Sequence, residues 1–221
     1  MNRSPKIIAI DGPAAAGKGT LAKHLAHHFG LELLDTGLLY RAVARKVLDM
    51  GVEIGEDPES YEENAGQAAR GLTAADLEVP GLRKDETAQA ASKVSAIPAV
   101  RKALLDFQRT FAETPPNQAA GAILDGRDIG TVVCPGADVK LFITATTEVR
   151  AQRRHKELQE RGEVSIYARV LNDMKERDAR DTGRNVSPLT PAEDALQIDT
   201  SDLDADQVFT AALEFISSQN T

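Results

Sequence analysis

The stretch Ile7-Ile-Ala-Ile-Asp-Gly-Pro-Ala-Ala-Ala-Gly-Lys-Gly-Thr20 decides the fold of this 221-residue chain. Residues 7–10 form an apolar run with the length of a buried strand, and after the loop Leu21 and Leu25 recur at helical spacing. A glycine-rich loop between a strand and a helix directs backbone N–H groups and the helix N-terminus at phosphate oxygens. The order of strand, loop and helix therefore predicts a phosphate-binding loop at residues 12–20.

Lys18 and Thr20 add chemistry to this loop. The lysine supplies a positive charge for the β- and γ-phosphates of a nucleotide, and a nearby hydroxyl can reach Mg²⁺. The strict pattern has Ser or Thr directly after the lysine, whereas here Gly19 intervenes. This Gly-Lys-Gly-Thr form is typical of kinases of small molecules and nucleoside monophosphates. The alternative is a glycine-rich turn that binds nothing, and the flanking strand, helix and lysine argue against it.

Apolar runs of strand length alternate with helical patterns along most of the chain. Strands are predicted at residues 7–10, 31–34, 122–124, 132–134, 139–143 and 195–198. Helices are predicted at residues 20–29, 36–50, 88–94, 99–111, 147–161, 166–178 and 205–217. This alternation predicts the α/β class, with a parallel β-sheet core and helices on both faces. Residues 42–103 break the rhythm and are interpreted as an insertion at the rim of the sheet.

Composition narrows the class of protein. The formal net charge of −8 makes general nucleic-acid binding an unfavoured interpretation, although arginines crowd residues 150–184 and suggest a local anion site. The single cysteine, Cys134, excludes an intramolecular disulfide and is interpreted as a small buried residue. No apolar run has the length of a membrane span, and the N-terminus lacks a signal-peptide pattern. We therefore expect a cytoplasmic protein with no membrane partner.

Three further patches carry candidate ligand-binding residues. Thr36, Tyr40 and Arg41 follow the second predicted strand, at the sheet edge where open α/β proteins bind ligands. A hydroxyl, a phenol and a guanidinium suit a phosphate with an attached base. The alternative reading is a helix cap, a core-edge aromatic residue and a solvated arginine, and residue types alone leave both open.

The second patch is Asp125-Gly-Arg-Asp-Ile-Gly130. Asp125 ends an apolar strand, where a carboxylate can hold Mg²⁺ through water. Arg127 offers a bidentate fork to phosphate, and Asp128 can accept from amine or hydroxyl donors. The alternative is an Asx turn with an ion pair.

The third patch is Lys175-Glu-Arg-Asp-Ala-Arg-Asp-Thr-Gly-Arg184. Guanidinium groups such as those of Arg177 and Arg184 stabilise the charge of a transferring phosphoryl group. The competing interpretation is a helix covered with surface ion pairs, each of which contributes little.

Together the motifs resemble those of the bacterial cytidylate (CMP/dCMP) kinases over nearly the whole chain. The resemblance runs through Ile10-Asp-Gly-Pro13, Gly17-Lys-Gly-Thr20, Leu34-Asp-Thr-Gly37, Tyr40-Arg41, Ala91-Ser92, Asp125-Gly-Arg-Asp-Ile-Gly-Thr131, Glu176-Arg-Asp178 and Arg180-Asp181. The loop is shared by many kinases, whereas Asp-Gly-Arg-Asp combined with Arg-Asp-x-x-Arg-Asp is far more specific. Thr36 stands where this family usually has Ser, and the hydroxyl is kept.

The resemblance implies the roles of individual residues. It implies that the ATP phosphates bind the loop Gly12, Pro13, Ala14, Ala15, Ala16, Gly17, Lys18, Gly19 and Thr20, with Arg153 closing over them. It implies that Thr36, Tyr40, Arg41, Arg127 and Arg184 surround the acceptor phosphate, that Ser92, Arg101 and Asp128 read the cytosine ring, and that Arg177 and Asp181 hold the sugar. Lys18, Arg127, Arg177 and Arg184 would be catalytic, and Thr20 and Asp125 would bind Mg²⁺, the latter through water.

The resemblance also implies an architecture and an activity. The expected fold is a three-layer P-loop kinase sandwich with a core at 1–41, 104–150 and 169–221, a monophosphate-binding insert at 42–103 and a lid at 151–168. The expected enzyme is a monomeric ATP:(d)CMP phosphotransferase of pyrimidine nucleotide metabolism. The alternatives are a kinase of another small acceptor such as shikimate or gluconate, a regulatory switch that hydrolyses ATP or GTP, and a structural domain that merely retains the loop.

Overall fold

The computed structural model describes residues 5–55, 57–184 and 186–219, and the chain divides into two compact units. The first unit comprises residues 1–34 and 110–221, and the second comprises residues 35–109. The second unit contains all of the predicted insert at 42–103, while the functional division into core, insert and lid stays a prediction. Every helix in the described ranges is too short or too polar to cross a bilayer.

The first unit is built on a five-stranded sheet with the strand order β2-β3-β1-β4-β5. Its strands are β1 (Ile7–Asp11), β2 (Glu32–Asp35), β3 (Ala122–Asp125), β4 (Val139–Thr144) and β5 (Leu196–Asp199). β1 pairs in parallel with both β3 and β4, and β4 pairs in parallel with β5. In this register Ile10 lies opposite Asp125, so the loops that leave β1 and β3 start side by side. The predicted α/β class with a parallel sheet is confirmed.

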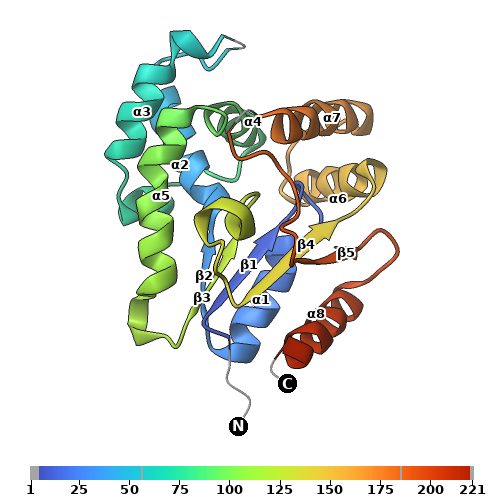
Figure 1. Cartoon of the computed structure of the whole chain (residues 1–221). Coiled ribbons are helices and arrows are strands. Elements are labelled where there is room, and N and C mark those ends of the chain that lie inside the picture. The colour runs from blue at the N-terminus through green and yellow to red at the C-terminus, as the bar shows by residue number, and fades with distance from the viewer. Residues whose placement is uncertain (1–4, 56, 185, 220–221) are drawn as a thin grey trace. The chain divides into compact units, whose positions relative to one another are not determined.

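Alternating strand residues bury one face of the sheet against two helices, α1 (Lys18–Phe29) and α8 (Ala205–Gln219) (Figure 1). Ile8 and Ile10 of β1 pack in one cluster with Leu25 of α1 and Ile216 of α8, all of them 2% exposed or less. The side chains between them, such as Ala9, are also fully buried. Side chains on both faces of β1 are therefore buried, which explains the continuous apolar run at residues 7–10.

Two further helices of the first unit form a hairpin, α6 (Thr147–Glu160) and α7 (Tyr167–Gly183), and lie side by side (Figure 1). Gly162, with φ of 76°, follows the C-terminus of α6 in the left-handed conformation that ends many helices. Ala151 of α6 and Met174 of α7 are buried between the helices, and Ala14 and Ala15 of the phosphate loop pack against the same cluster. The loop is therefore in contact with the hairpin.

The second unit is helical. It contains α2 (Thr36–Asp49), α3 (Glu62–Arg70), α4 (Asp85–Val94) and most of α5 (Pro98–Glu113), with 3-10 turns at Pro58–Ser60 and Ala74–Leu77. α2 packs against both α3 and α4. Sequence patterns missed α3, because its buried face consists of Ala65, Gly66, Ala68 and Ala69, which give only a weak apolar signal.

One predicted strand is wrong. Residues 132–134 belong to a π-helical turn, Ile129–Val133, and its end. The amide of Cys134 donates to the Ile129 carbonyl at 2.7 Å, and the amide of Val133 donates to the Asp128 carbonyl at 3.1 Å. Val133 and Cys134 are buried, as the sequence indicates, but a short apolar run does not distinguish a buried strand from a buried turn.

Candidate active site

The phosphate loop connects β1 to α1, and two glycines determine its shape. Gly12 has φ of 141°, and a Cβ atom there would lie 1.9 Å from the Ile143 carbonyl oxygen, so only glycine fits. Gly17, with φ of 97°, is the residue that turns into α1. The Lys18 ammonium donates to the Pro13 carbonyl at 2.8 Å and lies 3.8 Å from an Asp125 carboxylate oxygen. Lys18 therefore lies across the loop with its charge directed at the end of β3.

The positive charge of Lys18 is buried, which is energetically unfavourable. Its side chain is 5% exposed. Burial, together with the nearby Arg127 and Arg177 guanidiniums, lowers the pKa of Lys18 to about 8, while the carboxylates of Asp125 and Asp11 oppose the shift. The ammonium remains protonated at neutral pH, although the positive charges of Arg127 and Arg177 lie nearby. An anionic ligand beside Lys18 would offset their repulsion.

Three arginines surround one buried carboxylate in the same unit. We call Arg127, Arg177, Asp181 and Arg184 the arginine cluster. Arg127 Nε lies 3.1 Å from Asp181 Oδ2, Arg177 Nε lies 3.9 Å from the same oxygen, and Arg184 pairs with Oδ1. The structure thus brings together four of the residues predicted from separate sequence patches, and it disfavours the surface ion-pair interpretation, because Asp181 is 2% exposed.

The arginine cluster has an excess of positive charge. Burial raises the pKa of Asp181, but the three guanidiniums outweigh it and hold the pKa at about 2. Arg184 Nε is buried without a hydrogen-bond partner among the described residues. Buried N–H groups of this kind indicate a missing acceptor. A phosphate would supply one.

Asp125 and Thr20 offer oxygen atoms beside the loop. Asp125 ends β3, and its Oδ2 lies 3.5 Å from the position that a Cβ of Gly19 would take, next to Thr20 in the chain. The Thr20 side chain is exposed. Hydroxyl and carboxylate oxygens are ligands that Mg²⁺ prefers, together with water and phosphate oxygens, so these two residues fit such an ion. Asp128, in the turn after β3, is 4% exposed.

The second unit assembles its predicted residues around the N-terminal half of α2. The Arg101 guanidinium lies over the Tyr40 ring at 5.6 Å and donates to the Ser95 carbonyl at 3.1 Å. The Ser95 hydroxyl in turn donates to the Ser92 carbonyl at 2.9 Å. Arg41 donates to the Leu82 carbonyl at 3.0 Å. Tyr40, Arg101 and the Ser92 segment are thus held together, whereas Thr36 is buried at the start of the helix.

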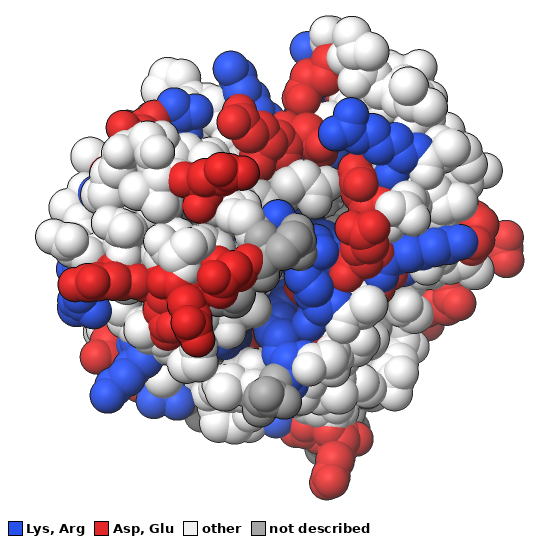
Figure 2. Space-filling view, turned by 90° about the horizontal axis from the view of Figure 1, so that it is seen from above, with Lys and Arg blue, Asp and Glu red and all other residues white. Residues whose placement is uncertain are grey.

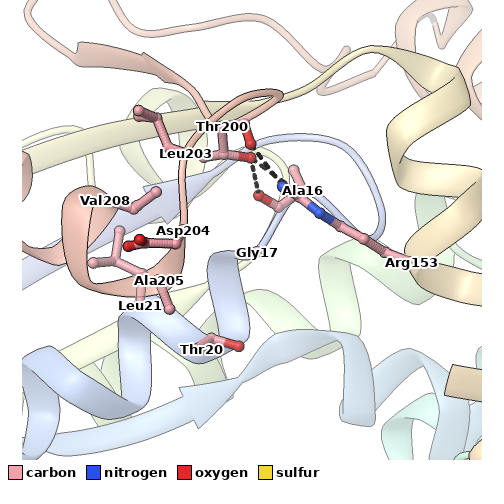
Figure 3. Close-up of a pocket in the computed structure, with 10 residues that line it drawn as sticks. All are labelled: Ala16, Gly17, Thr20, Leu21, Arg153, Thr200, Leu203, Asp204, Ala205 and Val208. Carbon is pink, nitrogen blue, oxygen red and sulfur yellow. Dashed lines mark hydrogen bonds between the residues drawn. The ribbon is translucent and has the colours of Figure 1, made fainter. Parts of the chain in front are cut away.

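A pocket of about 290 Å³ opens beside the phosphate loop in the first unit (Figure 3). Its lining residues are Ala16, Gly17, Thr20, Leu21, Arg153, Thr200, Leu203, Asp204, Ala205 and Val208. The Thr200 hydroxyl donates to the Ala16 carbonyl at 3.0 Å, so the segment after β5 is tied to the loop. Sequence reasoning missed this segment, because nothing in Thr200 to Ala205 forms a local motif.

Arg153 lies in the wall of this pocket. Its guanidinium donates to the Thr200 hydroxyl at 2.9 Å and to the Thr200 carbonyl at 2.6 Å (Figure 3). The predicted closure of Arg153 over the ATP phosphates stays a prediction. In this structure its hydrogen bonds hold the segment that follows β5.

Basic side chains are gathered on the surface, although the net charge of the chain is −8. On the face seen in Figure 2, Lys and Arg atoms form a blue group flanked by red Asp and Glu atoms. Such an uneven distribution attracts small anions without making the whole protein basic.

Comparison with known proteins shows the family to which the chain belongs. Residues 8–218 match the family model described as cytidylate kinase. A cytidylate kinase of Paramagnetospirillum magneticum is 62% identical over 96% of this chain and 98% of its own length, and one of Methylocella silvestris is 55% identical over 96% and 94%.

A solved structure of an uncharacterized protein from Eubacterium ventriosum shares the fold, with a TM-score of 0.51 and 16% identity over 97% of this chain and 99% of that one. The family match and the two relatives cover nearly the whole chain, including the phosphate loop and the arginine cluster. The chain belongs to the cytidylate kinase family.

Proposed function

We propose that this protein transfers the γ-phosphate of MgATP to CMP or dCMP, giving ADP and CDP or dCDP. The observation that carries the proposal is the charge of the first unit. Lys18 and the three arginines of the arginine cluster are four cations, and the carboxylates of Asp11, Asp125 and Asp181 lie beside them. Two polyanionic substrates repel each other, and such an excess of cations offsets that repulsion. Family membership supports the same activity.

The reaction needs little covalent chemistry from the protein. A phosphate oxygen of CMP is already anionic near neutral pH and attacks the γ-phosphorus in line, so no strong general base is required. Catalysis then depends on positioning and on stabilising charge. Lys18 and the arginines perform this role, and the loop at residues 12–20 presents backbone N–H groups to the donor phosphates.

Magnesium fits the donor side. Thr20 and Asp125 would hold it, Asp125 through water, and when bound it neutralises charge on the donor phosphates. We assign the acceptor phosphate to Thr36, Tyr40 and Arg41 of the second unit and to Arg127 and Arg184 of the first.

We assign the cytosine ring to Ser92, Arg101 and Asp128, and the sugar to Arg177 and Asp181. A carboxylate at position 128 accepts from the exocyclic amine of cytosine, which uracil lacks. Losing one such buried match costs about 1–3 kcal/mol, so CMP is preferred over UMP by roughly 5–150-fold in kcat/KM. Equal kcat/KM for CMP and UMP would contradict this role of Asp128.

The pocket beside the loop suits the base of the donor. It adjoins Gly17 and Thr20, combines apolar walls with a few polar groups, and has a volume at the lower end of small-molecule sites. Thr200→Val keeps the shape but removes the hydroxyl that joins Arg153 to Ala16. We expect KM for ATP to rise about 3–10-fold and KM for CMP to stay within about twofold.

Thr210→Val is the matched control for this change, since the Thr210 hydroxyl only donates to the Asp206 carbonyl on the exposed side of α8. If KM for ATP is unchanged in Thr200→Val, or if both KM values rise equally, the pocket does not bind the donor.

We further propose that the protein works as a cytoplasmic monomer, and that the lid at 151–168 and the insert at 42–103 close before transfer to exclude water as an acceptor. The test of the whole proposal is an ADP-release assay with CMP, dCMP, UMP, AMP and GMP. We expect strong activity with CMP and dCMP only. ADP release without any acceptor would favour a hydrolytic switch, and activity on shikimate or gluconate instead of CMP would favour another small-molecule kinase.

A further inference from the structure

Asp11 joins two loops of the first unit through one buried carboxylate. It is the last residue of β1, directly before Gly12 of the phosphate loop, and it is 5% exposed. Its Oδ1 accepts from the Ile129 amide at 2.8 Å, and its Oδ2 accepts from the Gly130 amide at 2.7 Å. Both amides belong to the first turn after Asp125-Gly-Arg-Asp128.

The same strand holds the other end of that turn. The Gly126 amide donates to the Ile10 carbonyl at 2.9 Å, so β1 binds the chain at position 126 and again at positions 129 and 130. Only Arg127 and Asp128 lie between these two attachments. These are the two residues of the turn that we assign to the acceptor nucleotide.

The contacts require a carboxylate in a restricted space. Two converging N–H donors need a group that accepts at both oxygens, and a neutral amide would turn an N–H against one of them. Gly130 has little room to change: a Cβ there would lie 3.2 Å from Lys140 Cδ and 3.4 Å from Asp11 Oδ2. Burial raises the pKa of Asp11 to about 6, although the two amides lower it, so the carboxylate is charged in assays at pH 7.5.

We propose that Asp11 is a positioning residue for phosphoryl transfer, which fixes Arg127 and Asp128 relative to the phosphate loop that begins at the next residue. The proposal rests on the proposed function. Asp11 would then connect both parts of the site: its backbone continues into the phosphate loop, and its side chain binds the turn that carries Arg127 and Asp128. The competing possibility is a carboxylate that only caps the π-helical turn and contributes to stability.

The test is Asp11→Asn, which keeps the size of the side chain. We expect kcat/KM for CMP to fall at least tenfold at pH 7.5, while the dissociation constant of ATP, measured by calorimetry, stays within about twofold. A residue that only stabilises the fold would lower Tm and leave the kinetics of the folded enzyme unchanged.

Asp138→Asn is the control, because Asp138, directly before β4, contacts the opposite end of β1. Asp138 Oδ2 accepts from the amides of Lys6 and Ile7, both at 2.9 Å, so it also holds two consecutive amides. Asn keeps one oxygen that can accept from both amides, so this variant tests the loss of a carboxylate charge on β1 at an exposed position away from the site. We expect it to change Tm little and to leave kcat/KM for CMP within about twofold.

The proposal is overturned if Asp11→Asn keeps the CMP kinetics of the wild type, or if Asp138→Asn alters them equally. Should Asp11→Asn fail to fold, Asp11→Glu keeps the charge but moves the carboxylate by one methylene relative to the Ile129 and Gly130 amides, and a fall in kcat/KM for CMP below about threefold overturns the proposal as well. A wild-type enzyme that phosphorylates no nucleotide refutes the proposed function, which is a different result from unchanged kinetics in an active enzyme.

Discussion

The phosphate loop and the arginine cluster both suit phosphate, but they are built in opposite ways. The loop is nine consecutive residues whose shape comes from glycines at positions 12 and 17, and it contributes one cation, Lys18. The arginine cluster combines Arg127 from the turn after β3 with residues at the end of α7, and it consists of side chains around Asp181.

The difference lies in what each region needs in order to form. The loop forms from local backbone geometry, so removing its lysine should affect the reaction and leave the fold intact. The arginine cluster brings three like charges together around the carboxylate of Asp181, which offsets their repulsion. Removing that carboxylate should therefore affect folding as well as the reaction.

Lys18→Ala gives the largest expected effect and tests the first half of this contrast. The ammonium acts on the transferring phosphoryl group, so we expect kcat to fall by about 10³-fold or more. Tm should not fall, because the substitution removes a buried charge whose pKa burial already lowers. The measurements are a coupled ADP-release assay and thermal unfolding, with exposed Lys23→Ala of α1 as the control. Near-normal turnover would show that Lys18 of the phosphate loop does not take part in catalysis.

Asp181→Asn tests the second half. It leaves three guanidiniums around a neutral amide, and we expect the free energy of unfolding at pH 7 to fall by about 3–5 kcal/mol, together with activity on CMP. Urea unfolding measures the first effect. The control is Asp194→Asn, since Asp194 pairs with Lys140 but has a side chain that is 66% exposed, and its loss should cost less than about 1 kcal/mol. Equal losses in the two variants would contradict the role of the cluster.

The stability difference between wild type and Asp181→Asn should also depend on pH. The folded pKa of Asp181, about 2, lies below the ordinary value of 3.8. Its charge therefore stabilises the folded state above pH 4, and that contribution is lost as the pH falls toward 2. We expect the difference between the two proteins to narrow by about 1 kcal/mol between pH 6 and pH 3. A difference that stays constant over this range would show that Asp181 is not the charge that holds the arginines.

The same contrast explains what could be predicted from sequence. The strand, loop and helix at residues 7–29 are contiguous, so their order alone indicated the phosphate loop, and the alternation of strands and helices along the chain indicated the parallel sheet. Arg127, Arg177 and Arg184 were recognised as candidates from their residue types, but their common partner follows from tertiary packing. Thr200 and Asp11 were missed for the same reason, because their partners, Ala16 and Ile129, lie 184 and 118 residues away in the chain.

Arg150→Lys tests whether the two regions are coupled. Arg150 is 4% exposed, and its Nε donates to the Ala145 carbonyl at 2.9 Å. Its other nitrogens bind both oxygens of Asp178, at 3.0 and 2.6 Å, on the helix that carries Arg177. The guanidinium also reaches the Ala14 carbonyl of the loop at 3.5 Å. It therefore contacts α6, α7 and the phosphate loop at once.

An ammonium keeps the charge of Arg150 but cannot make these contacts together. We expect Arg150→Lys to lose about 1–3 kcal/mol of stability and to raise KM for ATP and KM for CMP together by a few fold. Arg45→Lys, in an exposed pair with Asp49, should change neither. A rise confined to ATP would mean that the loop depends on Arg150 while the arginine cluster does not, and the two regions would then be independent as well as differently built.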